Sequence, residues 1–201
     1  MNEIPIRALV TFVLITTYTP GPNNIASASS GILYGYRKTL PFLLGIISAF
    51  FIIMLSSGLL SAKLNALLPN FEAMIRILGA VYILWLAYHA LRASYDFEIS
   101  NQDAPNYRQG FLLSILNPKG IVFGLSVHGA FLNPIADDLL LVLLASILLA
   151  SVAFTAISTW ALFGAAIRHW LRNPLVQRWL NATLALLLVY TAIEISALFN
   201  R

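Results

Sequence analysis

The chain has 201 residues, of which 59% are hydrophobic and only 10% are charged, and its mean hydropathy is +0.81. A soluble domain carries roughly a quarter charged residues, so this composition excludes a disordered chain and an ordinary soluble domain. A membrane-spanning helix needs about 20 mostly apolar residues, which leaves room for about six or seven spans with short loops. The twelve Lys and Arg residues are spread singly between apolar runs, so the net charge of +4 indicates loops that orient membrane helices and not a nucleic-acid partner. The absence of cysteine excludes disulfides and thiol catalysis.

Charged residues divide the chain into six charge-free stretches, each of which, with its flanks, predicts a transmembrane helix in the lipid bilayer. Two stretches have only 15 residues, and they become full spans if the bounding arginines reach back to the membrane surface. The fourth helix must begin near Gln109, because its charge-free part alone is too short, and Lys119 is then inside the membrane. The six stretches are Ala8–Tyr36, Thr39–Ala62, Ile77–Leu91, Gly120–Ala136, Leu139–Ile167 and Trp179–Ile193.

The positive charges indicate which side of the membrane each predicted loop faces. The connections after the first, third and fifth helices carry seven Lys and Arg residues, and the opposite side carries four. The positive-inside rule therefore puts those three connections in the cytoplasm and both termini outside. We expect one all-α transmembrane domain over 1–201, with halves of about 1–95 and 106–201 joined by a flexible cytoplasmic loop over about 94–107.

The two halves of the chain resemble each other. Pro20 and Pro118, 98 residues apart, interrupt the first and fourth predicted helices. Because each half holds three spans, a duplicated half must insert upside down, which predicts two inverted-topology repeats. The third and sixth helices also share residues at a spacing of 102, namely Arg76, Leu78, Ala80, Leu84, Leu86, Tyr88 and Ala90 with Arg178, Leu180, Ala182, Leu186, Leu188, Tyr190 and Ala192.

The two proline breaks indicate a substrate site. Proline removes a backbone hydrogen bond, and the groups it frees are tolerated in lipid only inside protein or beside a water-filled cavity. Broken helices in corresponding positions of two halves therefore predict a binding site near the membrane midplane, although a single proline kink can equally serve packing. We expect this site to contain Pro20, Gly21, Pro22, Asn23, Asn24, Asn117, Pro118 and Lys119.

Lys119 is expected about 15 Å along its helix from Arg108, at the middle of the bilayer. A cation there needs an anion, carbonyl groups or water. It can be the counter-charge for a substrate carboxylate or a proton-binding site, but it can also satisfy carbonyls freed by a proline break or extend to the membrane surface. Asn23 and Asn24 are likewise either ligands for a zwitterion or hydrogen-bonding groups between helices.

The remaining polar residues have simpler explanations. The small residues of Ala26–Gly31 are expected to let a neighbouring helix approach closely, Asp137 and Asp138 to cap the fifth helix, and Trp160 to lie in an interfacial aromatic belt. The three histidines do not cluster, and no metal site, cofactor or catalytic residue is predicted. A transporter is the preferred interpretation. A channel or metal-ion exporter on the same scaffold, an intramembrane enzyme and a structural protein are the alternatives.

Thr19–Asn24 and Asn117–Lys119 resemble the two signature stretches of amino-acid exporters of the LysE/RhtB type, and Gly35–Arg37, Gly79–Ala87 and Gly110–Leu112 also look like family positions. The resemblance runs along nearly the whole chain. It implies export of a small amino-acid substrate across the bacterial inner membrane, driven by the proton gradient, by a six-helix protein that can form a homodimer.

Within that family, Pro20–Ile25 and Ala185–Tyr190 resemble the branch that exports cysteine and O-acetylserine. Many family members have an aspartate where this chain has Asn23, so the resemblance assigns no coupled proton to that position. We expect the two halves to rock around the central site and so alternate its access. Lys119 would bind the substrate carboxylate, and the broken backbones would bind its ammonium group.

Overall fold

The computed structural model describes residues 6–67, 104–167 and 173–197, together with 81, 84, 87, 88, 91 and 92. Over these residues the chain forms seven α-helices and one 3-10 turn, with no strand, which confirms the predicted all-α fold for this part. Most of the third predicted span and of the polar loop lies outside the described residues. The elements are α1 (Ile6–Tyr18), α2 (Pro22–Tyr34), α3 (Tyr36–Leu67), α5 (Tyr107–Ile115), α6 (Pro118–Ala130), η1 (Asn133–Ile135), α7 (Leu139–Ile167) and α8 (Pro174–Ala197).

Two of the described helices are long and apolar enough to cross a membrane, namely Tyr36–Leu60 of α3 and Leu139–Ala166 of α7. A third crossing is formed if α5 and α6 are taken together, since they pass the same test as a pair bent by 58°. The first predicted helix is likewise divided, into α1 and α2. The breaks that the prolines predict in the first and fourth helices are therefore both present.

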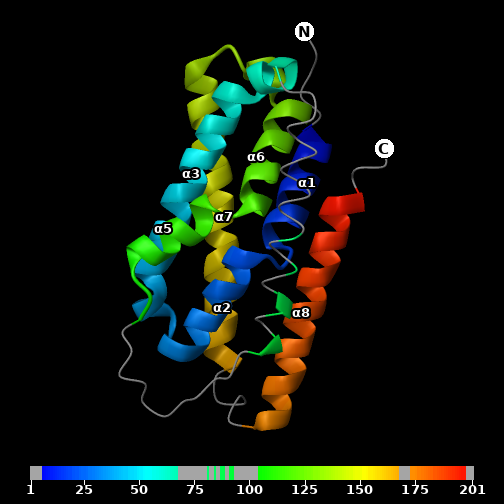
Figure 1. Ribbon diagram of the computed structural model, residues 1–201. Helices are drawn as coiled ribbons and strands as arrows, with labels where there is room; N and C mark the ends of the chain where they lie inside the picture. The colour runs from blue at the N-terminus through cyan, green and yellow to red at the C-terminus, as the bar shows by residue number, and fades with distance from the viewer. Residues whose placement is uncertain are drawn as a thin grey trace.

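The long helices α3 and α7 pack against each other at the centre, and the two broken helices pack around them. The α2 helix packs on α7, while α5 and α6 both pack on α3. Figure 1 shows that α2 and α6 leave the middle of the bundle in opposite directions, α2 toward one end and α6 toward the end where α1 begins. Both helices therefore start at the same central level.

In the described part of the chain, two hydrophobic clusters of buried residues follow one another along α3 and α7. The first joins α1, α3, α6 and α7 and includes Phe50, Phe123 and Ala153. The second joins α3 and α7 and includes Ile46 and Ile157. Residues of both clusters line the cavity described below, which therefore lies at the level where one cluster gives way to the other.

Glycines allow the helices to approach closely at two crossings. Gly31 and Gly164 face each other's helices between α2 and α7, and Gly45 and Gly110 do the same between α3 and α5. A Cβ atom on any of them would overlap a backbone carbonyl oxygen of the facing helix. The predicted packing role of the small residues in Ala26–Gly31 is therefore confirmed.

We expect Gly31→Ala to lower the melting temperature of the purified protein in detergent, because its methyl group would overlap the Ala161 carbonyl oxygen. Overpacking of this kind costs typically ~1–3 kcal/mol. Gly120→Ala is the matched control, since the nearest atoms would lie 3.7 and 3.8 Å from its Cβ, at ordinary contact distance. A Gly31→Ala variant that melts no lower than Gly120→Ala would contradict this packing.

Candidate functional site

The first break separates α1 from α2. Pro22 occupies the first turn of α2, where its missing N–H group is not needed and its fixed φ suits a helix start. Gly21 is the N-cap residue, in an extended conformation with φ −164° and ψ 176°, and it has no side chain with which to cap α2. The first turn of α2 therefore lacks a side-chain cap.

The second break separates α5 from α6. Pro118 again starts the helix, and the N-cap residue Asn117 accepts a hydrogen bond at Oδ1 from the Lys119 backbone N–H at 3.0 Å. Pro22 and Pro118 are thus equivalent as helix-starting residues. The sequence comparison paired Pro20 with Pro118 instead, but Pro20 lies two residues before its helix.

The Lys119 side chain crosses from the second break to the first. Its ammonium group donates to the backbone oxygen of Thr19 at 2.8 Å and to that of Pro20 at 3.3 Å. A Cβ atom on Gly21 would lie 2.8 Å from Lys119 Cδ and 3.1 Å from Nζ, so glycine leaves room for the lysine. The sequence left several roles open for Lys119. The structure shows one of them: its ammonium group binds the backbone carbonyls that the first proline break sets free.

Two more side chains bind the carbonyl groups at the end of α1. Asn24 Nδ2 donates to Thr17 O at 2.9 Å and to Thr19 O at 3.0 Å. Trp160 Nε1, on α7, donates to Tyr18 O at 3.2 Å, so this tryptophan is tied to the break, not only to an aromatic belt. The carbonyls of Thr17–Pro20 therefore all have donors, as backbone in a membrane core requires.

A cavity of about 50 Å³ lies where the two breaks meet. A single buried water needs roughly 10–15 Å³ of such space, so the cavity suits the head group of a small solute. Its polar side is lined by Thr16, Thr17, Gly21, Asn23, Asn24, Asn117, Lys119 and Gly120. Its apolar side, called the apolar wall below, consists of Ile46, Phe50, Phe123, Ala153 and Ile157.

The structure brings five of the eight predicted site residues to this cavity: Gly21, Asn23, Asn24, Asn117 and Lys119. The three prolines do not line it. Sequence reasoning missed Thr16 and Thr17, although two adjacent threonines just before the first break were a visible signal. The residues of the apolar wall could not be recognised in the sequence, because isoleucine, phenylalanine and alanine occur throughout the predicted spans.

Asn23 lines the cavity and carries an acceptor without a partner among the described residues. Its Nδ2 donates to Ser114 Oγ on α5 at 3.0 Å, which fixes the orientation of the amide group. Its Oδ1 is buried and has no hydrogen-bond partner within the part of the chain that the structure describes. A buried acceptor of this kind calls for a donor, and an ammonium group, a hydroxyl or a thiol can supply one.

Positive charge also gathers on the polar side of the cavity. The N-termini of α2 and α6 both contribute lining residues, and each helix start carries roughly half a positive charge from its peptide dipoles. The Lys119 ammonium adds a full charge beside them. The site can therefore hold a carboxylate near the helix starts and a donor at Asn23, which is the pattern of an amino-acid zwitterion.

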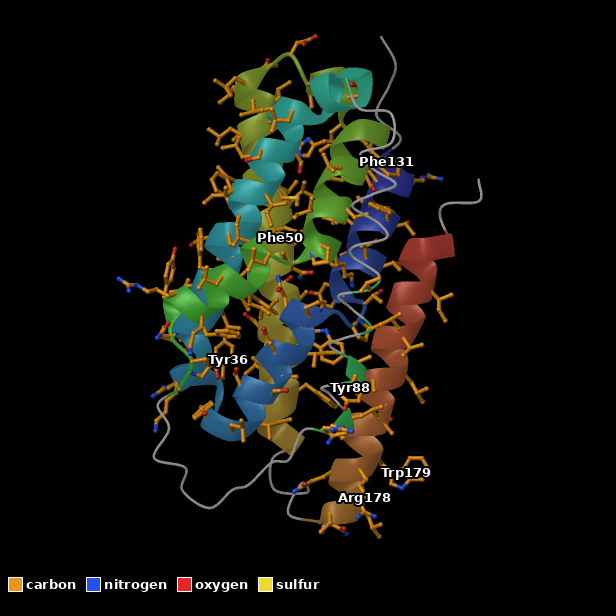
Figure 2. All side chains as sticks on the ribbon, in the orientation of Figure 1. Tyr36, Phe50, Tyr88, Phe131, Arg178 and Trp179 are labelled. Atoms are coloured by element: carbon orange, nitrogen blue, oxygen red, sulfur yellow. The ribbon has the colours of Figure 1, made fainter. Side chains whose placement is uncertain are left out.

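Phenylalanine rings cover the cavity toward the end of the bundle where α1 begins. Phe50 and Phe123 of the apolar wall stack at 5.9 Å between ring centroids, and Phe12 adds a ring 5.7 Å from Phe123 and 5.3 Å from Phe131. Figure 2 shows Phe50 at mid-height of the bundle and Phe131 near the end of α6.

The described residues contain no group of three His, Cys, Asp or Glu side chains that could hold a metal ion. Asp138 caps α7 as predicted, accepting from the backbone N–H groups of Leu140 at 2.9 Å and Leu141 at 3.1 Å. The sequence placed His128 near a helix end and gave it no role. The structure buries it in α6, with only 2% of its surface exposed.

The protein is a multi-pass membrane transporter and not an enzyme. The chain belongs to the LysE type translocator family, whose model matches residues 14–197. It is similar to the cysteine/O-acetylserine efflux proteins of Salmonella typhimurium and Shigella flexneri, at 33% and 35% identity respectively, over 97% of this chain and 99% of each relative. The protein of that name from Klebsiella pneumoniae is 33% identical over 97% of this chain and 98% of its own length. No solved structure matches the chain.

We expect Asn24→Leu to destabilise the fold, because it removes the donor to Thr17 O and one of the donors to Thr19 O. A buried polar group left without a partner costs about 1–3 kcal/mol. Asn23→Leu is the matched control, because it removes one hydrogen bond together with an unpartnered oxygen. Thermal unfolding in detergent should show a clearly larger loss for Asn24→Leu, and equal losses would refute the assigned roles.

Proposed function

We propose that this transporter exports small neutral amino acids, of the size of cysteine and O-acetylserine, from the cytoplasm. The observation that carries the proposal is the cavity between the two broken helices, which combines positive helix starts, an unpartnered acceptor on Asn23 and a small apolar wall. The activity for which the three similar efflux proteins are named supports the same substrate class.

In the proposed complex, the substrate carboxylate binds Lys119 and the start of α2, where no side chain caps the helix. The substrate ammonium group binds Asn23 Oδ1 and the carbonyls of Thr19 and Pro20. Those two carbonyls already hold an ammonium group, that of Lys119, so their position suits the charge of the ligand. The substrate side chain lies on the apolar wall.

This binding mode exchanges one set of contacts for another. The carboxylate draws Lys119 away from the first break, and the substrate ammonium group takes the place that the lysine leaves. Because Lys119 lies in the first turn of α6 and its partners directly follow α1, the exchange loosens a direct link between the two broken helices. We propose that this loosening lets the halves move and alternate access to the site.

The proposed architecture is six spans in two inverted repeats, within one domain over 1–201 with halves of about 1–95 and 106–201. Two observations support it: both broken helices restart at a proline, and α2 and α6 leave the cavity in opposite directions (Figure 1). We also propose proton-driven antiport in the bacterial inner membrane, with both termini periplasmic and a homodimer as the assembly. The loop charges and the family resemblance support this arrangement.

Export of radiolabelled O-acetylserine from proteoliposomes tests the site through Lys119. We expect Lys119→Met to reduce export at least about tenfold, since a hydrogen bond to a charged group contributes roughly 1.5–3 kcal/mol. Lys119→Arg should retain more activity, and Lys38→Met, an exposed lysine near the start of α3, should behave as the unsubstituted protein does. Substrate should raise the melting temperature of the unsubstituted protein but not that of Lys119→Met. If Lys119→Met exports O-acetylserine at the rate of the unsubstituted protein, Lys119 does not bind the substrate.

The apolar wall predicts a change of substrate range in Ile157→Ala. Removing buried carbons there enlarges the cavity, so export of phenylalanine and other neutral amino acids larger than O-acetylserine should rise by about tenfold relative to export of O-acetylserine, as pocket size typically allows. Leu149→Ala removes a buried side chain of the same helix outside the cavity and should leave the preference unchanged. Competition against labelled O-acetylserine measures both, and an unchanged preference in Ile157→Ala would argue against this wall.

A further inference from the structure

His128 is a buried ionisable group that the proposed substrate site does not use. It lies on α6 with 2% of its surface exposed, and its Nε2 has no hydrogen-bond partner among the described residues. An ionisable side chain inside a membrane span is costly, and such residues commonly mark ion or proton pathways. Its position therefore calls for an explanation other than packing.

The imidazole ring lies directly on the backbone of α3. A Cβ atom on Gly58 would be 2.8 Å from His128 Cε1 and 3.0 Å from Nδ1, and 2.6 Å from the Val142 side chain of α7. Only a glycine at position 58 leaves room for this contact. The contacts seen at this point are the Gly58 backbone and the Val142 side chain, neither of which offers a counter-charge, so a neutral imidazole is tolerated there better than a charged one.

Among the side chains that the structure describes, no charged residue of a neighbouring element forms a hydrogen bond with His128 Nε2. Arg7 on α1 is exposed, as are Asp137 and Asp138 before α7, and Asp138 is already the cap of that helix. Lys63 follows Gly58 on α3 by five residues, and its side chain is outside the described part of the chain. On α6 itself the charged residue is Lys119, nine residues earlier.

His128 lies between the cavity and one end of the bundle. Nine residues of α-helix place it about 14 Å beyond Lys119, toward the end where η1 lies and past Phe123 of the apolar wall. Gly120, Gly124 and His128 follow at intervals of four and share the face of α6 that packs on α3. A movement of α6 on α3 therefore acts on the substrate site and on His128 together.

We propose that His128 is the residue that binds and releases the driving proton. The inference rests on the proposed function, in its proton-driven form. Imidazole is the side chain whose charge ordinarily changes between pH 5 and 8. When Nε2 binds a proton, the charged ring is unstable against Gly58, so this end of α6 separates from α3 and the ring meets water. When the proton leaves, the neutral ring returns to the dry contact. Only this N–H bond forms and breaks, and the substrate is chemically unchanged.

The test separates exchange of substrate from its accumulation. Full-length protein is reconstituted in proteoliposomes, and radiolabelled O-acetylserine is followed in counterflow without a pH gradient and in uptake into vesicles with an acidic interior. A gradient of about one pH unit drives up to about tenfold accumulation per proton exchanged. We expect His128→Gln and His128→Asn to retain counterflow within about twofold of the unsubstituted rate and to lose accumulation. His169→Gln, which removes a histidine outside the described residues, is the control and should accumulate normally.

A second measurement uses His128 itself. Replacing His89 and His169 by glutamine leaves His128 as the single histidine of the three in the chain, and its imidazole nitrogen resonances report its charge. We expect that charge to change when O-acetylserine is added. An unchanged charge overturns the proposal, as does normal accumulation in either His128 variant, or loss of counterflow in both variants when they remain folded. If the unsubstituted protein shows no counterflow, the proposed function has failed; if it exchanges substrate but ignores the pH gradient, only the proton role has failed.

Discussion

The structure depends on donors for the backbone carbonyls that the break between α1 and α2 sets free. In a membrane core these groups have no bulk water, so each needs a partner within the protein. The partners come from three elements: Asn24 from α2, Trp160 from α7 and Lys119 from α6. A local interruption of one helix thereby fixes the positions of two others, and it brings a lysine to the centre of the bundle without leaving its charge unpaired.

The same constraint explains why the cavity lies where it does. A helix that stops and restarts exposes carbonyls at one side of the break and a positive helix start at the other. Because α2 and α6 both restart at this level, two helix starts and the Lys119 ammonium surround one small space. An apolar wall from α3, α6 and α7 borders the same space, so charged groups and apolar side chains both line it.

Local chemistry made the breaks, the caps and the long helices predictable. Pro22 and Pro118 can start helices but not continue them, and Asp138 is a typical N-cap residue, so these features depend on a few neighbouring residues. The partners of Lys119 and Trp160 could not be predicted, because their acceptors lie 100 and 142 residues away in the chain. For the same reason His128 could not be recognised as buried, since its contact with Gly58 exists only once α6 packs on α3.

A transporter also needs states of similar free energy, since a site that binds too firmly in one state does not turn over. The Lys119 contact meets this need in a direct way. Before substrate binds, the Thr19 and Pro20 carbonyls hold the ammonium group of the protein; in the proposed complex they hold that of the substrate, while Lys119 gains a carboxylate. The number of charged hydrogen bonds changes little between the substrate-free and the substrate-bound arrangement. Neither arrangement is therefore much lower in free energy than the other. A second ionisable group on α6, such as His128, can then decide which arrangement is favoured. Because the spans hold so few ionisable residues, very few side chains can take that role.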